Sequence, residues 1–423
     1  LLQPQSINEG FNQPSQRFLL LKVVRFHFFI YKLHFACFLG VMISRKISLS
    51  ESSTFLFGPR GTGKTLWLKT NYPDAIYIDL LDSSIALRLT AQPGRIAEFI
   101  PPEYTGTVIV DEVQKIPELL DEIHKLIEST PIQFILTGSS PRKLRKLGTN
   151  LLAGRALTRN SFPLTAVELG KAFDLEQMLK YGHLPTLYDD RKNVIPEDYL
   201  SSYVQTYLKE EILQEGLTRN IGGFTRFLEA ASFSQGEVLN ISGVAREAAI
   251  NRKVVEAYFD ILEDLLIAVR VQVFQKKAKR RMVQHPKFYF FDVGVYRTIR
   301  PKGPLDAPEE IDGAALETIV LQELRAWISY NHLDLSIYYW RTTNGQEVDF
   351  VLYGAEGLIA LEVKRSNRFD RKDLKGLKAF KSDYHSARCI LLYGGTENLY
   401  YDDLEIIPME QIIRNPQQLL SSD

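Results

Sequence analysis

The chain has 423 residues, too many for one hydrophobic core, and this length indicates two or three domains. Its composition, 45% hydrophobic and 24% charged, is that of an ordinary soluble globular protein. Basic and acidic residues are equal at 51 each, which excludes a global positive field for nucleic acid. Two cysteines, Cys37 and Cys389, exclude a disulfide framework or a multi-cysteine zinc site and fit a cytoplasmic location.

Residues 1–41 are strongly apolar and aromatic, and three interpretations exist for them. A membrane span is disfavoured because Lys22, Arg25 and Lys32 interrupt the apolar run. A signal peptide is disfavoured because the small-residue cleavage site is missing. We therefore expect translation to start at Met42 and residues 1–41 to be translated upstream sequence or a disordered extension.

A phosphate-binding loop follows the short apolar stretch TFLF at residues 54–57 and precedes a predicted helix that starts KTLWL. This strand–loop–helix context is the one that the motif G-x-x-x-x-G-K-[ST] requires, and it makes a chance glycine-rich turn improbable. Backbone amides of the loop and the helix N-terminus are suited to bind phosphates. The predicted ATP-binding residues are Gly58, Pro59, Arg60, Gly61, Thr62, Gly63, Lys64 and Thr65.

Within this loop, Lys64 is expected to contact the β- and γ-phosphates and Thr65 to ligate Mg²⁺. A second apolar strand, around Val108–Val110, ends in two acids. Asp111 is expected to hold Mg²⁺ through water, and Glu112 to polarise the attacking water. The neighbouring glutamate favours hydrolysis over transfer to a small-molecule hydroxyl.

Two more strands, at residues 75–80 and 132–140, complete a predicted β-α-β-α-β-α-β order and a three-layer α/β domain. Thr137 and Ser139, with Ser140 beside them, are predicted to sense the γ-phosphate. Arg155 is predicted to act as an arginine finger or sensor, and a surface salt bridge is an equally good interpretation.

These segments resemble the AAA-type ATPases of bacteria and archaea that end in a domain of unknown function. The resemblance rests on FGPRGTGKT, VIVDEVQKIPELLDEIHKLIE, FILTGSSPRKLRK and LAGRALTRNSFPLTAVEL, and further along on HPKFYFFDVGVYRTI and GAALETIVLQELRAW. It covers about residues 42–400 and implies binding and hydrolysis of ATP with Mg²⁺. It implies no settled biological task.

The middle of the chain is predicted to be helical. Residues 166–215 are expected to form a helical connector with an amphipathic helix that carries Tyr203, Tyr207, Leu208 and Ile212. Residues 216–285 then follow a winged-helix-like pattern of two helices, a turn at Ile250–Asn251 and a strand before a basic run. In the second helix, we expect Val254, Val255, Tyr258, Phe259 and Leu262 to face inward.

The basic residues of this region permit two interpretations, contact with DNA phosphates or a solvated module that contacts protein. The predicted DNA-contacting residues are Arg252, Lys253, Lys276, Lys277, Lys279, Arg280 and Arg281.

Residues 286–410 are predicted to form a PD-(D/E)XK-like, restriction-endonuclease-like domain, with residues 411–423 as a C-terminal tail. A long helix places Glu317 inside its apolar arc, so that carboxylate needs a basic or metal partner. A hairpin then brings Asp349 near Glu362 and Lys364.

In a nuclease of this type, the three carboxylates Glu317, Asp349 and Glu362 hold a metal, and Lys364 activates water. The alternative is a catalytically inactive cluster in which the carboxylates pair with Lys364 or an arginine. The chain is then an ATP-switched DNA-binding or scaffold protein.

The overall expectation is an α/β multidomain protein with a P-loop three-layer αβα ATPase domain at residues 42–165. Its expected ligands are ATP and Mg²⁺. DNA or a partner protein is a further expected ligand of the chain, and the sequence is compatible with an oligomer.

Overall fold

The computed structural model describes residues 43–142, 144, 152, 154–189, 192–208, 220–303 and 308–421. The expected extension at residues 1–41 lies outside this set, as does Ile212. Residues 45–188 and 194–421 belong to one compact unit that contains two β-sheets. In the described part of the chain, no helix is long and apolar enough to cross a membrane.

The first sheet has five parallel strands in the spatial order β2-β3-β4-β1-β5. The strands are β1 (Thr54–Phe57), β2 (Ile76–Asp79), β3 (Thr107–Asp111), β4 (Gln133–Gly138) and β5 (Leu157–Asn160). The first four confirm the predicted strands. The edge strand β5 was not predicted because its sequence, LTRN, is polar and only half-buried or exposed.

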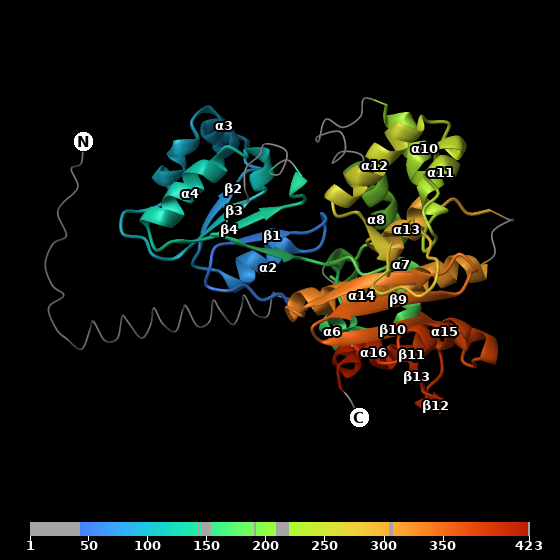
Figure 1. Cartoon of the computed structure of the whole chain (residues 1–423). Helices are drawn as coiled ribbons and strands as arrows, with labels where there is room; N and C mark the ends of the chain where they lie inside the picture. The colour runs from blue at the N-terminus through green and yellow to red at the C-terminus, as the bar shows by residue number, and fades with distance from the viewer. Residues whose placement is uncertain are drawn as a thin grey trace, which may run out of the picture. The chain divides into compact units, whose positions relative to one another are not determined.

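Helices cover both faces of this sheet, as the alternation of side chains along each strand requires. They are α2 (Lys64–Asn71), α3 (Ser83–Ala91), η1 (Pro93–Phe99), η2 (Val113–Lys115) and α4 (Leu119–Ser129). Figure 1 shows α3 and α4 on the side of the sheet opposite to α2. The resulting three-layer arrangement confirms the predicted α/β architecture.

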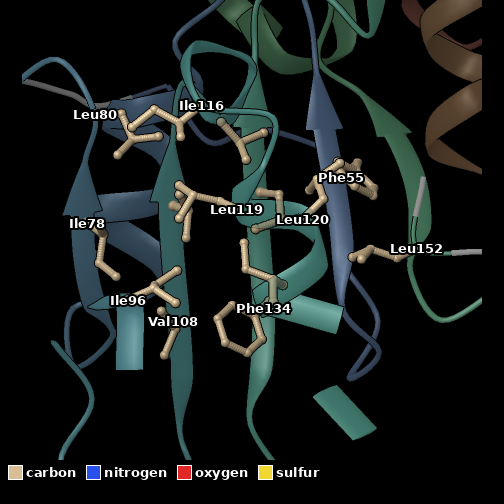
Figure 2. Close-up of a cluster of buried hydrophobic side chains, with 14 of the residues drawn as sticks. Phe55, Ile78, Leu80, Ile96, Val108, Ile116, Leu119, Leu120, Phe134 and Leu152 are labelled. Atoms are coloured by element: carbon tan, nitrogen blue, oxygen red, sulfur yellow. The ribbon is translucent and has the colours of Figure 1, made fainter. Parts of the chain in front are cut away.

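Two hydrophobic clusters correspond to the two faces. On one face, Phe55, Val108 and Phe134 pack against Leu119 and Leu120 of α4 (Figure 2). On the other face, Leu56, Ile109 and Ile135 of the same strands pack against α2, where they contact Trp67 and Leu68. Adjacent residues of one strand therefore pack into different layers, and the loop after β1 begins at the carboxyl end of this strand.

The connector is a series of short helices, and the last two are contiguous over residues 196–208, the described part of the predicted amphipathic helix. Its elements are α6 (Ala166–Leu169), η3 (Gly170–Ala172), α7 (Leu175–Tyr181), η4 (Pro185–Tyr188), α8 (Pro196–Ser202) and the π-helix η5 (Tyr203–Leu208). A capping box between Thr165 and Glu168 begins α6. Tyr203 and Leu208 are buried as predicted.

Three helices and a hairpin follow. They are α10 (Ile221–Ser232), α11 (Ile241–Glu247), α12 (Arg252–Asp264), β6 (Ala268–Val273) and β7 (Lys287–Phe290). Asn251 accepts the amide of Lys253 and caps α12, which explains the predicted turn. One prediction in α12 is wrong: Val254 is 39% exposed, because the adjacent Val255 occupies the inward position on the helix.

The second sheet is mixed and has eight strands in the order β12-β13-β11-β10-β9-β8-β6-β7. Its further strands are β8 (Leu335–Arg341), β9 (Glu347–Gly354), β10 (Gly357–Val363), β11 (Arg388–Tyr393), β12 (Leu399–Tyr401) and β13 (Leu404–Pro408). The helices of this part are α13 (Val293–Ile299), α14 (Pro308–Tyr330), η6 (Arg371–Leu374), α15 (Lys375–Asp383), α16 (Met409–Arg414) and η7 (Pro416–Leu419).

The predicted hairpin is confirmed, because Gly354 and Gly357 are paired residues across the turn between β9 and β10. This register places Asp349 on β9 beside the end of β10, where its Oδ2 accepts the amide of Val363 at 2.8 Å. Glu362 and Lys364 flank that amide. The turn therefore determines which polar side chains meet at this end of the sheet.

Candidate nucleotide site and C-terminal charge cluster

The phosphate-binding loop lies between β1 and α2, and its glycines are required by its shape. Gly61 and Gly63 have φ values of 84° and 83°, in the left-handed region that favours glycine. A Cβ on Gly58 would lie 2.4 Å from the carbonyl oxygen of Ser161, so a side chain there is excluded by close approach. The left-handed backbone explains Gly61 and Gly63, and the close approach of Ser161 explains Gly58.

Lys64 is the first residue of α2, and its ammonium group lies inside the loop. Its Nζ donates to the carbonyl oxygens of Gly58 at 2.6 Å and Pro59 at 3.2 Å. The residue is 6% exposed. A buried ammonium held by two loop carbonyls is a charged donor suited to phosphate, and the predicted contact of Lys64 with the β- and γ-phosphates stays a prediction.

Asp111 at the end of β3 is joined to the loop through a hydroxyl group. Thr65 Oγ1 donates to Asp111 Oδ2 at 2.8 Å, and the same carboxylate accepts from the hydroxyls of Tyr77 and Thr137. A carboxylate and a threonine hydroxyl in contact are the oxygen ligands that Mg²⁺ prefers, so these residues fit the expected metal. Sequence analysis missed Tyr77, although its place near the end of β2 was a signal.

Glu112 follows Asp111 in the left-handed conformation, with φ at 61°. Such a conformation is uncommon for a residue with a side chain and often occurs at functional sites. Its amide donates to Thr137 Oγ1 at 3.2 Å, and Gln114 donates to its carboxylate. Gln114 also donates to Ser139 Oγ at 3.2 Å.

The polar end of β4 therefore contacts the acids of β3. Thr137 contacts the carboxylate of Asp111 and the backbone amide of Glu112, and Ser139 contacts the carboxylate of Glu112 through Gln114. By contrast, the hydroxyl of Ser140 donates to the carbonyl oxygen of Asp264 at 2.7 Å, at the end of α12 and not in the phosphate-binding loop. The predicted γ-phosphate sensing by Thr137 and Ser139 stays a prediction.

A buried charge cluster forms in the C-terminal sheet around a residue that sequence analysis missed, Lys287 at the start of β7. Its Nζ lies 2.5 Å from Glu347, 3.5 Å from Glu317 and 3.6 Å from Asp349. The lysine side chain is 3% exposed. Burial opposes its charge, but Tyr289 and the surrounding carboxylates raise the pKa of Lys287 well above its ordinary value.

The carboxylates of the cluster are perturbed in turn. Burial, reinforced by the charge of Asp349, raises the pKa of Glu317 to about 7, and Tyr289 donates to Glu317 at 2.8 Å. Burial also raises the pKa of Glu362 to about 8, although Lys364 Nζ contacts it at 2.7 Å. The basic partner that Glu317 was expected to need is thus Lys287.

A lysine lies beside two of the three carboxylates that were predicted to hold a second metal ion. In the described part of the chain, no group of three or more histidines, cysteines or acids is arranged to hold a metal ion. Lys287 Nζ lies between Glu317, Glu347 and Asp349, whereas Glu362 contacts Lys364 instead. The ammonium of Lys287 stands where a cation would lie beside Glu317 and Asp349, and the predicted metal binding by Glu317, Asp349 and Glu362 and the predicted role of Lys364 stay predictions.

Comparison with known proteins divides the chain into three parts. Residues 50–170 match the family model described as AAA domain, and residues 172–306 and 312–412 match two models described as Domain of unknown function (DUF8612 and DUF4143). Residues 50–170 form an AAA domain. The likeness to nucleases at the C-terminus is not shown by these matches.

No curated protein matches the sequence. Solved structures similar to the chain include the Aeropyrum pernix ORC1 protein in complex with DNA, at 12% identity over 59% of this chain and 86% of that chain, with a TM-score of 0.25. The Bacillus subtilis DNA clamp loader delta protein is 17% identical over 65% and 95%, with a TM-score of 0.23. Protein VC1899 from Vibrio cholerae is 12% identical over 81% and 96%, with a TM-score of 0.22. TM-scores this low do not establish a shared fold.

Two arginines of the AAA domain have partners within the chain. Arg155 NH2 lies 2.5 Å from Glu128 Oε1 on the surface, which is the salt bridge of the second interpretation. Its predicted role as a finger or sensor stays a prediction. Arg60 stacks over the ring of Tyr207, with 4.6 Å between the guanidinium carbon and the ring centroid.

The basic residues beyond the AAA domain are placed differently from one another. Arg252 forms an exposed pair with Glu256, and Lys276 lies over the ring of Tyr353. Arg280 donates to Asp383 at 2.7 Å and, like Lys276, contacts the C-terminal sheet region. The basic run therefore packs against residues 312–412 rather than extending freely.

Arg280 also lines a cleft of about 620 Å³ beside the hairpin. Three acidic side chains line the cleft, among them Glu362, whose buried Oε2 has no hydrogen-bond partner in the described part of the chain. Five basic side chains line it: Arg280, Lys364, Lys372, Lys375 and Lys378.

Proposed function

We propose that the chain is a Mg²⁺-dependent ATPase whose AAA domain couples ATP hydrolysis to a task of the two following domains. One observation carries the proposal: the hydrogen bond of 2.8 Å between Thr65 and Asp111 joins the phosphate-binding loop to the acidic end of β3. That contact brings a phosphate cradle, a metal-binding pair and Glu112 to one edge of one sheet, as ATP hydrolysis requires.

Each residue has a distinct role in this proposal. Lys64 binds the β- and γ-phosphates, and Thr65 and Asp111 hold Mg²⁺, which neutralises phosphate charge when bound. Glu112 orients the attacking water and accepts its proton. Its carboxylate is positioned by Gln114 and its backbone by Thr137, so the base is held in place from two sides.

A phosphotransferase that acts on a small hydroxyl compound is the weaker interpretation. A glutamate directly after the metal-binding aspartate suits a water molecule, and its left-handed backbone turns it away from the strand direction. Hydrolysis in the absence of any acceptor molecule distinguishes the two activities. The proposal requires phosphate release from ATP alone.

Equilibrium binding of ATP tests the first step. Lys64→Ala is expected to abolish ATP binding, because the ammonium inside the loop is removed. Lys46→Ala, which removes an exposed lysine of the segment before β1, is the control and is expected to bind ATP like the wild type. Normal affinity of Lys64→Ala for ATP would contradict the assignment of the loop.

A second proposal concerns the two C-terminal domains, in which α10–α12 and the β6–β7 hairpin follow the order of a winged helix. We infer that the basic side chains at the cleft bind the phosphates of nucleic acid, with the charge cluster as an inactive scaffold. The specific observation is that Arg280 of the basic run and lysines of α15 line one cleft.

DNA binding over a range of salt concentrations tests this second proposal. Charge reversal at Arg280, Lys375 and Lys378, which line the cleft, is expected to weaken binding and to flatten its salt dependence. Reversal at Arg252 and Lys253, on the α12 N-terminus, separates a helix-based contact from a cleft-based one. Unchanged binding in the first variant, or none by the wild type, favours contact with a partner protein.

A further inference from the structure

The carbonyl groups of the phosphate-binding loop are held by residues from outside the loop. The carbonyl oxygen of Arg60 accepts from the Tyr203 hydroxyl at 2.8 Å. The carbonyl oxygen of Thr62 accepts from Arg45 NH1 at 2.6 Å. Neither donor lies within the matched AAA segment, since Arg45 precedes β1 and Tyr203 lies in the connector.

The amides that follow these two carbonyls have no acceptor. Gly61 N–H and Gly63 N–H donate no hydrogen bond to any residue that the structure describes. Two backbone donors in a loop rich in left-handed residues form a concave site for an anion. Phosphate oxygens of the nucleotide are the acceptors that such amides lack.

Peptide geometry links the anchored carbonyls to these amides. A trans peptide is planar, and its carbonyl and N–H groups point in opposite directions. Anchoring the carbonyl of Arg60 therefore orients the amide of Gly61, and anchoring that of Thr62 orients the amide of Gly63. We propose that Arg45 and Tyr203 are positioning residues of the ATP site, which aim these two amides at the phosphates.

Arg45 is itself rigidly held, as a positioning residue should be. Its side chain is 6% exposed, and its Nε lies 3.0 Å from Glu168 Oε1. Its NH2 donates to the carbonyl oxygen of Phe162 at 2.7 Å and to the hydroxyl of Tyr330 at 3.1 Å. Four hydrogen bonds, to Glu168, Thr62, Phe162 and Tyr330, therefore hold the guanidinium in place, and the Thr62 carbonyl is one of the groups it fixes.

Tyr203 is the more direct subject for a test because a single hydroxyl makes the contact. Tyr203→Phe removes that hydroxyl and keeps the ring in the core. Tyr207→Phe is a matched control on the same π-helix turn: it keeps the ring that stacks on Arg60. Arg45→Lys is the second variant, since a lysine retains the charge but not the four-way contact.

The inference rests on the proposed ATP binding, and the assay separates the two. Affinities for ATP and for inorganic tripolyphosphate are measured for the wild type and each variant in the full chain, together with the melting temperature without ligand. Tyr203→Phe is expected to bind both ligands about 2- to 10-fold more weakly, the effect of one hydrogen bond. Tyr207→Phe is expected to match the wild type.

Two results would overturn the inference while the ATPase proposal stands: unchanged affinities in Tyr203→Phe, or weaker binding of ATP with unchanged binding of tripolyphosphate. A fall in melting temperature with unchanged affinities would also overturn it, because the contact is then structural only. A wild type that binds neither ligand would refute ATP binding itself.

Discussion

Replacing Lys287 by methionine tests the interpretation of the C-terminal cluster most sharply. The substitution keeps most of the side-chain volume and removes the ammonium group that lies within 4 Å of three carboxylates. Removing one partner of a buried ion pair leaves uncompensated charge and costs about 3–5 kcal/mol. We expect the free energy of unfolding of Lys287→Met to fall by about this amount at pH 8.5.

The loss should depend on pH in a defined direction. Burial raises the folded-state pKa of Glu317 to about 7, above its ordinary value near 4.5, so the folded protein retains this proton as the pH rises. Because Lys287 opposes that rise, its removal raises the pKa of Glu317 further. The variant then binds more protons than the wild type above pH 7 and loses stability faster as the pH increases. The deficit is smaller at pH 6.

Urea unfolding followed by tryptophan fluorescence measures the effect, since Trp327 and the fully buried Trp340 lie in the same domain. Lys378→Met is the control: it removes an exposed ion pair with Asp402, worth at most about 1 kcal/mol. An equal, small loss in both variants at every pH would refute the reasoning. So would calorimetric binding of Mn²⁺ by the wild-type cluster, because a metal cannot share the space with the ammonium.

Other expectations concern individual positions. Thr137→Val, which removes the hydroxyl that contacts the Asp111 carboxylate and the Glu112 amide, should slow ATP turnover in a phosphate-release assay more than it weakens ATP binding. Asn251→Ala should lower the free energy of unfolding by about 1 kcal/mol in urea, because the cap of α12 is lost. Gly182→Ala should lower the melting temperature, since its φ is 73° and a Cβ there would lie 2.3 Å from Asp292.

The nucleotide site could be predicted from sequence because its main parts are local. Gly58 to Thr65 form one uninterrupted stretch, and each acid of β3 follows an apolar run that a buried strand produces. The parts that join these segments were not predictable in this way. Tyr203 contacts Arg60 across 143 positions of the chain, and no local pattern marks that contact.

The sequence indicated the carboxylates of the charge cluster but not the lysine at its centre. The apolar arc of α14 indicates that Glu317 needs a partner. The candidate named from the sequence, Lys364, follows Glu317 in the chain. The actual partner, Lys287, lies 30 positions before Glu317 in the strand KFYF. This strand is otherwise apolar and is buried, so its lysine needs a partner of opposite charge just as Glu317 does. A buried lysine in an apolar strand and a buried glutamate on an apolar helix face together indicate an ion pair as readily as a metal site.

Single-turnover hydrolysis of ATP by Glu112→Gln tests the central claim most directly. The variant retains Lys64, Thr65 and Asp111, so it should bind ATP as the wild type does. Removal of the general base should slow phosphate release by about 10²- to 10⁴-fold. Full-rate hydrolysis by Glu112→Gln would contradict the proposed role of this residue, and absence of hydrolysis by the wild type would contradict the proposed activity.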